Sequence, residues 1–124
     1  MAASGFMNLT VWQRAMELMR ESYKVAEKLP HTERYGMADQ MRRSALSVPS
    51  NIAEGHSRSH VGEYLNHLSI ASGSLAELQT LLIAARDIGY VSSPQLARPL
   101  SLALETSRML SALRSAVRRR GRST

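Results

Sequence analysis

Apolar residues recur at steps of three and four along most of the chain, the spacing that places side chains on one face of an α-helix. Four segments carry this pattern: residues 9–29, 32–55, 60–88 and 93–117. No segment shows the alternation of apolar and polar residues that is typical of a strand. Four amphipathic helices with short connections predict an all-α fold, an antiparallel up-down-up-down four-helix bundle.

Each predicted helix has an apolar stripe that we expect to face the core. In the first helix the stripe consists of Trp12, Met16, Met19, Tyr23 and Ala26. For the bundle as a whole we expect six side chains in particular to be buried: Trp12, Met41, Val48, Leu68, Leu75 and Leu110.

Local signals mark the ends of the helices. Thr10 and Gln13 fit a capping box at the start of the first helix, and Thr32 is the expected cap of the second. Pro30 disfavours a helical conformation in the residue before it and so ends the first helix. Gly89 is the expected stop of the third helix.

Residues 40–55 carry a polar stripe beside the apolar one. Its members are Gln40, Ser44, Ser47 and Asn51, with Arg43 and Glu54 at its edge. A solvated helix face is usually rich in Lys and Glu, so short polar side chains indicate close approach of another helix, with hydrogen bonds across the contact. The third helix has a stripe of small residues, and Gly73 within it costs about 1 kcal/mol relative to Ala. We therefore expect close packing at Gly73, within or between subunits.

Two acidic residues, Glu54 and Glu77, are candidates for a paired-carboxylate site. Such acids more often pair with nearby arginines, and Arg42 and Arg43 are the expected counter-ions. We expect one of these two arginines to pair with Glu77 and to fix the second helix against the third.

The stretch from Gln40 to Gly55 also resembles a family signature. Its sequence, QMRRSALSVPSNIAEG, is similar to that of the small four-helix-bundle proteins encoded by intervening sequences of bacterial 23S ribosomal RNA. The resemblance extends upstream to LTVWQRAMEL from Leu9 and downstream to LSIASGSLAEL from Leu68. The same superfamily includes the accessory protein of diversity-generating retroelements.

The resemblance implies partners as well as a fold. Members of this superfamily assemble as ring-like homopentamers of four-helix bundles, so a homo-oligomer, most simply a pentamer, is expected here. The retroelement relative binds nucleic acid and a reverse transcriptase. A ring would bring several weak phosphate-binding sites together and so raise the overall affinity through avidity.

The charge of this 124-residue chain is concentrated near its C-terminus. The net charge is +6, and residues 114–124 contain five arginines and no acid, so the remainder carries only +1. A basic segment is typical of a nucleic-acid-binding arm, but it can also serve solubility alone. The candidate nucleic-acid-binding residues are Arg114, Arg118, Arg119, Arg120 and Arg122, with Arg43 and Arg58 as possible additions. With one Trp, one Phe and four Tyr, binding would rest on phosphate contacts, which carry little sequence information.

The sequence gives little support for an enzymatic function. His60, Glu63 and His67 share a helix face at spacings that can hold a metal, and His56 lies just upstream, but no matching ligands appear on another helix. The chain has no cysteine and neither a nucleophile elbow nor a phosphate loop. We expect no catalytic site, no metal and no cofactor.

The remaining expectations concern organisation and location. Residues 1–8 are predicted to be disordered, residues 9–117 to form the bundle and residues 118–124 to form a basic tail. No secretory signal is visible, and the longest apolar run is too short to span a membrane, so a cytoplasmic protein is expected. Three functions stay open: a nucleic-acid-associated bundle, a scaffold oligomer with a protein partner such as a reverse transcriptase, and an enzyme with an unrecognised site.

Overall fold

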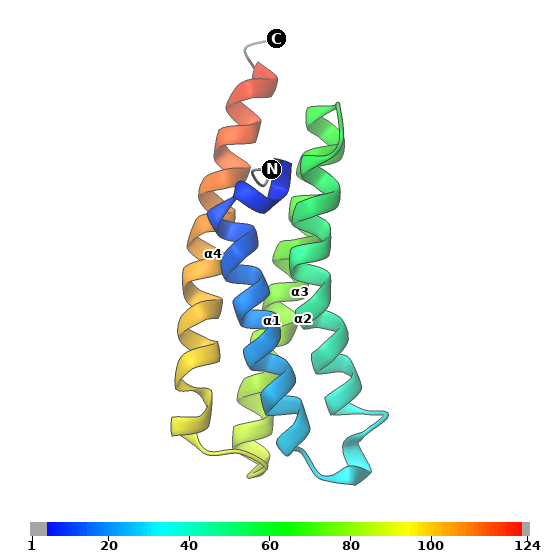
Figure 1. The fold of residues 1–124 in the computed structure, drawn as a ribbon, viewed down its shortest axis with the longest axis vertical. Helices are drawn as coiled ribbons and strands as arrows, with labels where there is room; N and C mark the ends of the chain where they lie inside the picture. Colours follow the sequence, from blue (N-terminus) through cyan, green and yellow to red (C-terminus); the bar gives the residue numbers. More distant parts are fainter. Residues whose placement is uncertain (1–4, 123–124) are drawn as a thin grey trace.

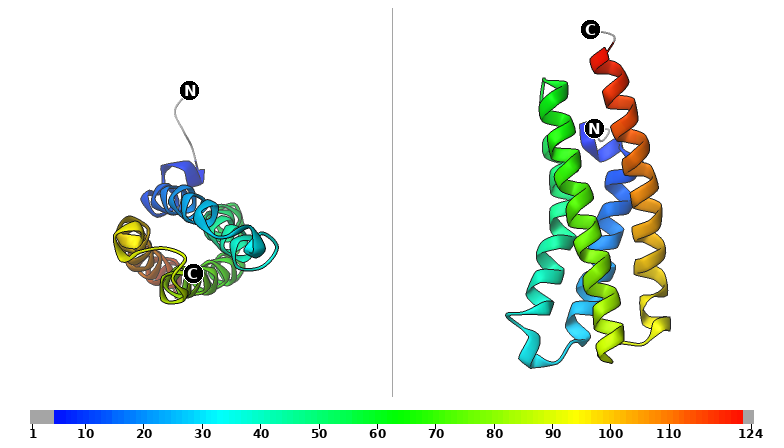
Figure 2. Two further views of the ribbon diagram at one scale, coloured as in Figure 1. Left: turned by 90° about the horizontal axis from the view of Figure 1, so that it is seen from below. Right: turned by 180° about the vertical axis from the view of Figure 1, so that it is seen from behind.

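The computed structural model describes residues 5–122, without the side chain of Arg122. The elements in chain order are η1 (Gly5–Asn8), α1 (Thr10–Lys28), η2 (His31–Glu33), α2 (Met37–His56), α3 (Val61–Ile88) and α4 (Ser93–Arg122), where η denotes a 3-10 helix. Successive helices run antiparallel, and α1 packs against α4 to close the bundle (Figure 1). The end-on view shows the four helices around a shared interior (Figure 2). The predicted all-α, four-helix architecture is confirmed, and residues 5–122 contain no strand.

The core is formed by aliphatic side chains from all four helices. Five of the six side chains expected in the core are buried: Met41, Val48, Leu68, Leu75 and Leu110. Trp12 is half-buried, so its predicted position is wrong. Its ring instead packs edge-to-face on Phe6 of η1, with ring centroids 5.2 Å apart.

The core face of α1 is shifted by one position along the sequence relative to the predicted stripe. The buried positions are Val11, Ala15, Leu18, Ser22, Val25 and Ala26, and the larger Met16, Met19 and Tyr23 border them. The buried apolar residues of α1, Leu18 among them, belong to one core cluster with Leu, Ile and Met side chains of the other helices.

The helix ends agree with the sequence only in part. Gly89 has a φ of 98°, and the Tyr90 amide donates to the Ala85 carbonyl at 2.9 Å, which confirms the glycine stop of α3. The Thr10 capping box is absent: Thr10 already belongs to α1, and the Gln13 side-chain amide donates to the Met7 carbonyl. Thr32 lies in η2, away from the start of α2.

Both terminal segments are more regular than expected. Residues Gly5–Asn8 form η1, so the predicted disorder is wrong for this part of residues 1–8, while residues 1–4 lie outside the described range. Helix α4 continues to Arg122, so the boundary expected between residues 117 and 118 is wrong too. The basic segment is the last part of a bundle helix.

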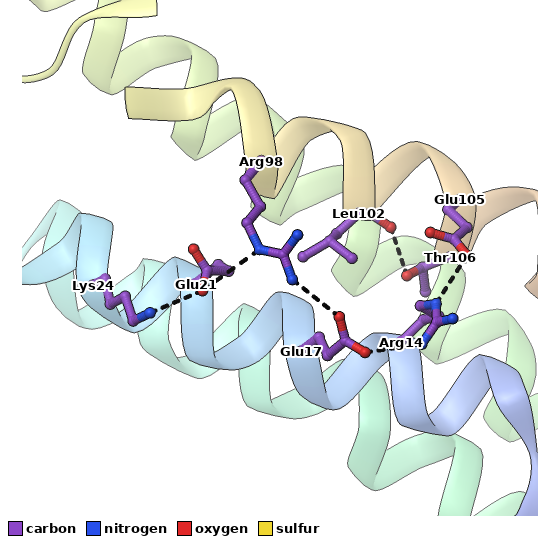
Figure 3. Close-up of polar contacts among 8 residues, drawn as sticks. All are labelled: Arg14, Glu17, Glu21, Lys24, Arg98, Leu102, Glu105 and Thr106. Carbon is purple, nitrogen blue, oxygen red and sulfur yellow. Dashed lines mark hydrogen bonds and ion pairs between the residues drawn. The ribbon is translucent and has the colours of Figure 1, made fainter. Parts of the chain in front are cut away.

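A row of alternating charges follows the contact between α1 and α4 (Figure 3). The Arg14 guanidinium donates to Glu105 of α4 at 2.9 Å and to Glu17 of its own helix at 2.8 Å. Arg98 of α4 lies 3.3 Å from Glu17 and 3.9 Å from Glu21. The hydrogen bond that Arg14 donates to the Glu105 carboxylate raises the pKa of Arg14. These half-exposed pairs fix the register of α1 against α4 more than they stabilise the fold.

One helix within residues 5–122, α3, is long and apolar enough to cross a membrane by length and composition alone. Leu68, Leu75, Leu78 and Leu82 of this helix are buried in the bundle. The core helix of a soluble protein passes the same test.

Candidate nucleic-acid interface

The polar stripe of α2 meets α3 within the same subunit. The hydroxyls of Ser47 and Ser74 lie 2.8 Å apart across this contact. The Asn51 side-chain amide donates to the Ser47 hydroxyl at 3.0 Å, and the Asn51 oxygen lies 3.0 Å from Nδ1 of His67. Because that oxygen can only accept, His67 carries its proton on Nδ1. The expected hydrogen bonds between helices are therefore present at Ser47 and Asn51.

The other members of the stripe lie elsewhere. Gln40 is exposed, and the buried Ser44 hydroxyl donates to the Met41 carbonyl of its own helix. Glu54 is exposed, with its carboxylate 3.7 Å from Nδ1 of His67.

The closest backbone approach occurs at Gly55, and the expectation of close packing at Gly73 within the subunit is wrong. A Cβ atom added to Gly73 would meet nothing within 4 Å. A Cβ atom at Gly55 would lie 2.9 Å from both the His67 Cβ and the Tyr64 ring. Gly55 belongs to the last turn of α2, and its missing side chain lets α2 pack against α3.

The expected ion pair between Glu77 and Arg42 or Arg43 is also wrong. Arg43 donates to Asp39 of its own helix at 2.8 Å, and the Arg42 guanidinium lies 5.9 Å from the centroid of the Tyr23 ring. Glu77 is exposed on α3. Ser74 and His67, not Glu77, are α3 residues that contact the polar stripe of α2.

Except for Arg43, which lies in the first half of α2, the candidate nucleic-acid-binding arginines lie toward one end of the bundle. Helix α4 reaches this end beside the turn between α2 and α3, which contains Arg58 (Figures 1 and 2). A Cβ atom at Gly121 would lie 2.9 Å from a methyl group of Val61, so the last turn of α4 packs on the first turn of α3. The arginines are thus carried by a docked helix.

Individual arginines of this end differ in exposure. Arg118 and Arg119 are exposed, and Arg120 places its guanidinium 5.6 Å from the centroid of the Tyr64 ring. Arg114 is half-buried: one terminal nitrogen donates to the Ser69 hydroxyl at 3.3 Å, and its Nε is buried without a hydrogen-bond partner. The side chain of Arg122 lies outside the described residues.

A cleft of about 170 Å³ opens between the α2–α3 turn and the end of α4. Its lining consists of His56, Arg58, Ser59, His60, Val61, Tyr64 and Arg120. The Tyr64 hydroxyl lies 3.1 Å from Nδ1 of His56, and their rings meet edge-to-face. Burial raises the pKa of Tyr64, and the charge of Arg120 partly offsets this shift. Tyr64 was not predicted as a site residue from the sequence, because its place at the cleft depends on how α2 packs on α3 at Gly55.

The histidines do not gather into a metal centre. Within the described residues, no group of three or more His, Cys, Asp or Glu side chains could hold a metal ion. His56 contacts Tyr64, and His67 contacts Asn51.

Comparison with known proteins identifies the family. The sequence model of the 23S rRNA-intervening sequence proteins matches residues 7–112. The chain belongs to this family. The resemblance carried by Gln40 to Gly55 is thereby confirmed. The family match ends before Arg114, whereas Arg58 and most of the cleft lie inside it.

A solved structure of another protein shares the fold of this chain. It is a protein of unknown function from the S23 ribosomal protein family of Bacteroides thetaiotaomicron, with a TM-score of 0.77 and 20% sequence identity. The alignment covers 84% of this chain and 97% of that one. At this identity the likeness shows the fold alone. No curated protein matches the chain significantly.

Proposed function

We propose that this protein is a non-enzymatic, oligomeric bundle of the cytoplasm that binds structured RNA or DNA through arginine–phosphate contacts with low sequence specificity. The observation that carries the proposal is the placement of Arg118 and Arg119, exposed on a docked helix end beside Arg58. No acidic residue follows Glu105 in the chain, so α4 offers no carboxylate of its own to neutralise this end.

Electrostatics favours phosphate as the partner of this end. Guanidinium groups bind phosphate oxygens in bidentate fashion and stay charged at any physiological pH. A duplex displays phosphates at regular spacing, and each phosphate that the protein neutralises releases counterions, which makes binding salt-dependent. The seven candidate arginines contribute unequally: Arg43 is paired with Asp39, and Arg114 is held against Ser69.

Oligomerisation is part of the same proposal, and the outer face of α3 supports it. We define this face as the exposed residues Ile70, Gly73, Ala76, Thr80 and Ile83. Glu77 is the one charged residue among the exposed residues of this part of α3, which is few for a solvated helix face, and the small residues would allow a second helix to approach closely. A ring built on this face, a pentamer in our proposal, would present several cationic ends to one nucleic acid and add avidity.

The same apolar face favours a second candidate function. A scaffold oligomer could use it, or the exposed Leu46 and Leu104, to bind a protein partner such as a reverse transcriptase. In that case the arginines of α4 serve solubility, and the protein has no appreciable affinity for RNA or DNA at physiological salt.

Charge-matched variants separate the two functions. We expect Arg118→Ala with Arg119→Ala to weaken binding to a duplex RNA and to make the log–log salt dependence shallower by roughly two per engaged subunit. Arg20→Ala with Arg108→Ala removes the same charge from exposed positions elsewhere and serves as the control. Point variants are preferable to deleting residues 114–124, because Val117 in that segment is buried.

Two outcomes would contradict the proposal. An equal loss of affinity in both double variants would mean that binding follows net charge and does not reside at this end. No measurable affinity in the unaltered protein at physiological salt would favour the scaffold.

A further inference from the structure

We propose that the cleft between the α2–α3 turn and the end of α4 is a discrete binding site for a single phosphate group. The residues that line it include Arg58, Arg120, His60 and Ser59, whose side chains offer two guanidinium groups, an imidazole and a hydroxyl. This site is distinct from Arg118 and Arg119, which do not line the cleft. It also stands independently of nucleic-acid binding, because a free phosphate ion suffices to test it.

The positive charge of the residues that line the cleft favours an anionic ligand. None of the described residues that line this cleft is acidic, whereas two other clefts each include a carboxylate. Glu27 lies in the cleft beside Arg34 and Arg42, and Glu54 lies in the cleft beside Phe6. Guanidinium groups bind phosphate oxygens in bidentate fashion, and this cleft has two arginines in its lining.

The start of α3 adds to this preference. The long helix α3 begins at Val61, and its cap residue, His60, makes no side-chain hydrogen bond to the first turn. The first backbone N–H groups of a helix lack partners within the helix and carry partial positive charge. They lie at the same end of α3 as His60 and Val61 of the cleft, so they reinforce the side-chain cluster.

The walls of the cleft are fixed before any ligand binds. Gly55 lets the end of α2 pack on Tyr64, and Gly121 lets the end of α4 pack on Val61. Tyr64 then holds two side chains, with its ring against the Arg120 guanidinium and its hydroxyl against His56. Because these contacts already hold Arg120 and His56, little of their side-chain entropy is lost when the anion binds.

The size of the cleft limits the ligand. At about 170 Å³ it is smaller than the roughly 300–1,000 Å³ typical of pockets for whole small-molecule ligands. A phosphate group fits such a space, while a nucleoside attached to it would remain outside. The phosphate can come from a nucleic-acid backbone or from a free phosphate ion.

The experiment titrates the full chain with three probes and follows the His60 and Tyr64 resonances by NMR. The probes are inorganic phosphate, dimethyl phosphate as a mimic of the backbone diester, and a short duplex RNA. We expect at least one probe to shift both resonances in a saturable way. A response to inorganic phosphate alone identifies a free phosphate ion as the ligand, and a response to dimethyl phosphate and RNA identifies the backbone.

Variants test whether the cleft itself is responsible. Arg58→Gln with His60→Gln changes two exposed turn residues, and we expect it to weaken binding of the responding probe about tenfold or more. Arg108→Gln, an exposed residue of α4 outside the cleft, is the control and should bind as the unaltered protein does. The proposal is overturned if no probe shifts His60 or Tyr64, or if the control weakens binding as much as the cleft variant.

Discussion

Gly55 of α2 lies directly against Tyr64 of α3. A Cβ atom at position 55 would stand 2.9 Å from Cδ1 of the Tyr64 ring and 3.2 Å from the Tyr64 carbonyl oxygen. The end of α2 can approach α3 this closely only because glycine has no side chain. The contact also sets the position of Tyr64, which holds His56 and Arg120 at the cleft.

Adding one methyl group at Gly55 is therefore expected to destabilise the bundle. Gly55→Ala should lower the free energy of unfolding by about 1–3 kcal/mol, the usual cost of overpacking. Gly73→Ala is the matched control, because a Cβ atom there meets nothing within 4 Å. That substitution should stabilise the isolated bundle by up to about 1 kcal/mol through helix propensity. Urea denaturation at equal protein concentration measures both, and a stabilising Gly55→Ala would refute the contact.

The two glycines show what the sequence could and could not predict. Helix spacing identifies four helices because it depends on the chain alone. A glycine inside a helix lowers helix stability, which indicates that close packing compensates for the loss. Which of the two glycines is closely packed depends on how the helices are rotated about their axes. Gly55 faces α3, whereas Gly73 faces outward.

The same reasoning explains Trp12 and the arginines of α2. The predicted apolar stripe of the first helix contains Trp12, yet α1 is rotated so that the smaller Val11 and Ala15 face the core. Asp39 lies one helical turn from Arg43 and pairs with it locally, while Glu77 faces away from α2. The cationic end was predictable from composition, but its docking on α3 depends on the tertiary contact at Gly121.

The burial of each leucine predicts how much it contributes to the stability of the fold. Leu68 is fully buried and Leu104 is 49% exposed. Leu68→Ala should cost about 2–5 kcal/mol of stability, the transfer free energy plus the cavity left behind. Leu104→Ala should change stability by less than about 0.5 kcal/mol. Thermal and urea unfolding followed by circular dichroism compare the two, and equal effects would mean that the core of the bundle is misassigned.

The polar contact between α2 and α3 predicts a difference between two members of one stripe. Asn51 joins Ser47 to His67, so Asn51→Ala leaves Nδ1 of the half-buried His67 without its hydrogen-bond partner. The Ser47 hydroxyl keeps its contact with Ser74. We expect a loss of about 1–3 kcal/mol. Gln40→Ala, at an exposed position of the same stripe, should be close to neutral. If the two variants are equally stable, the network contributes nothing to stability.

Burial of Tyr64 predicts loss of stability at alkaline pH. Its pKa is raised in the folded state above the ordinary value of 10.0, so the unfolded chain releases this proton first. The contribution of Tyr64 is therefore complete below pH 10 and is lost as pH rises through the folded-state pKa. Tyr64→Phe should flatten the fall in stability between pH 9 and pH 11, relative to Tyr35→Phe at an exposed position. Urea denaturation at the two pH values checks this, and identical slopes in the two variants would contradict it.

The outer face of α3 predicts how the subunits associate. If subunits assemble through it, light scattering should report a mass several times the 13.7 kDa of one chain, and five times that value for the pentamer that we propose. Ile70→Glu with Ile83→Glu places two carboxylates on this face, and burying them in an interface without partners is costly. We expect that variant to dissociate into folded monomers, since neither side chain belongs to the core. Leu104→Glu adds a charge to an exposed apolar position of α4 and should leave the mass unchanged. A single-chain mass for the unaltered protein at micromolar concentration would exclude the oligomer, and dissociation by Leu104→Glu alone would move the interface to α4.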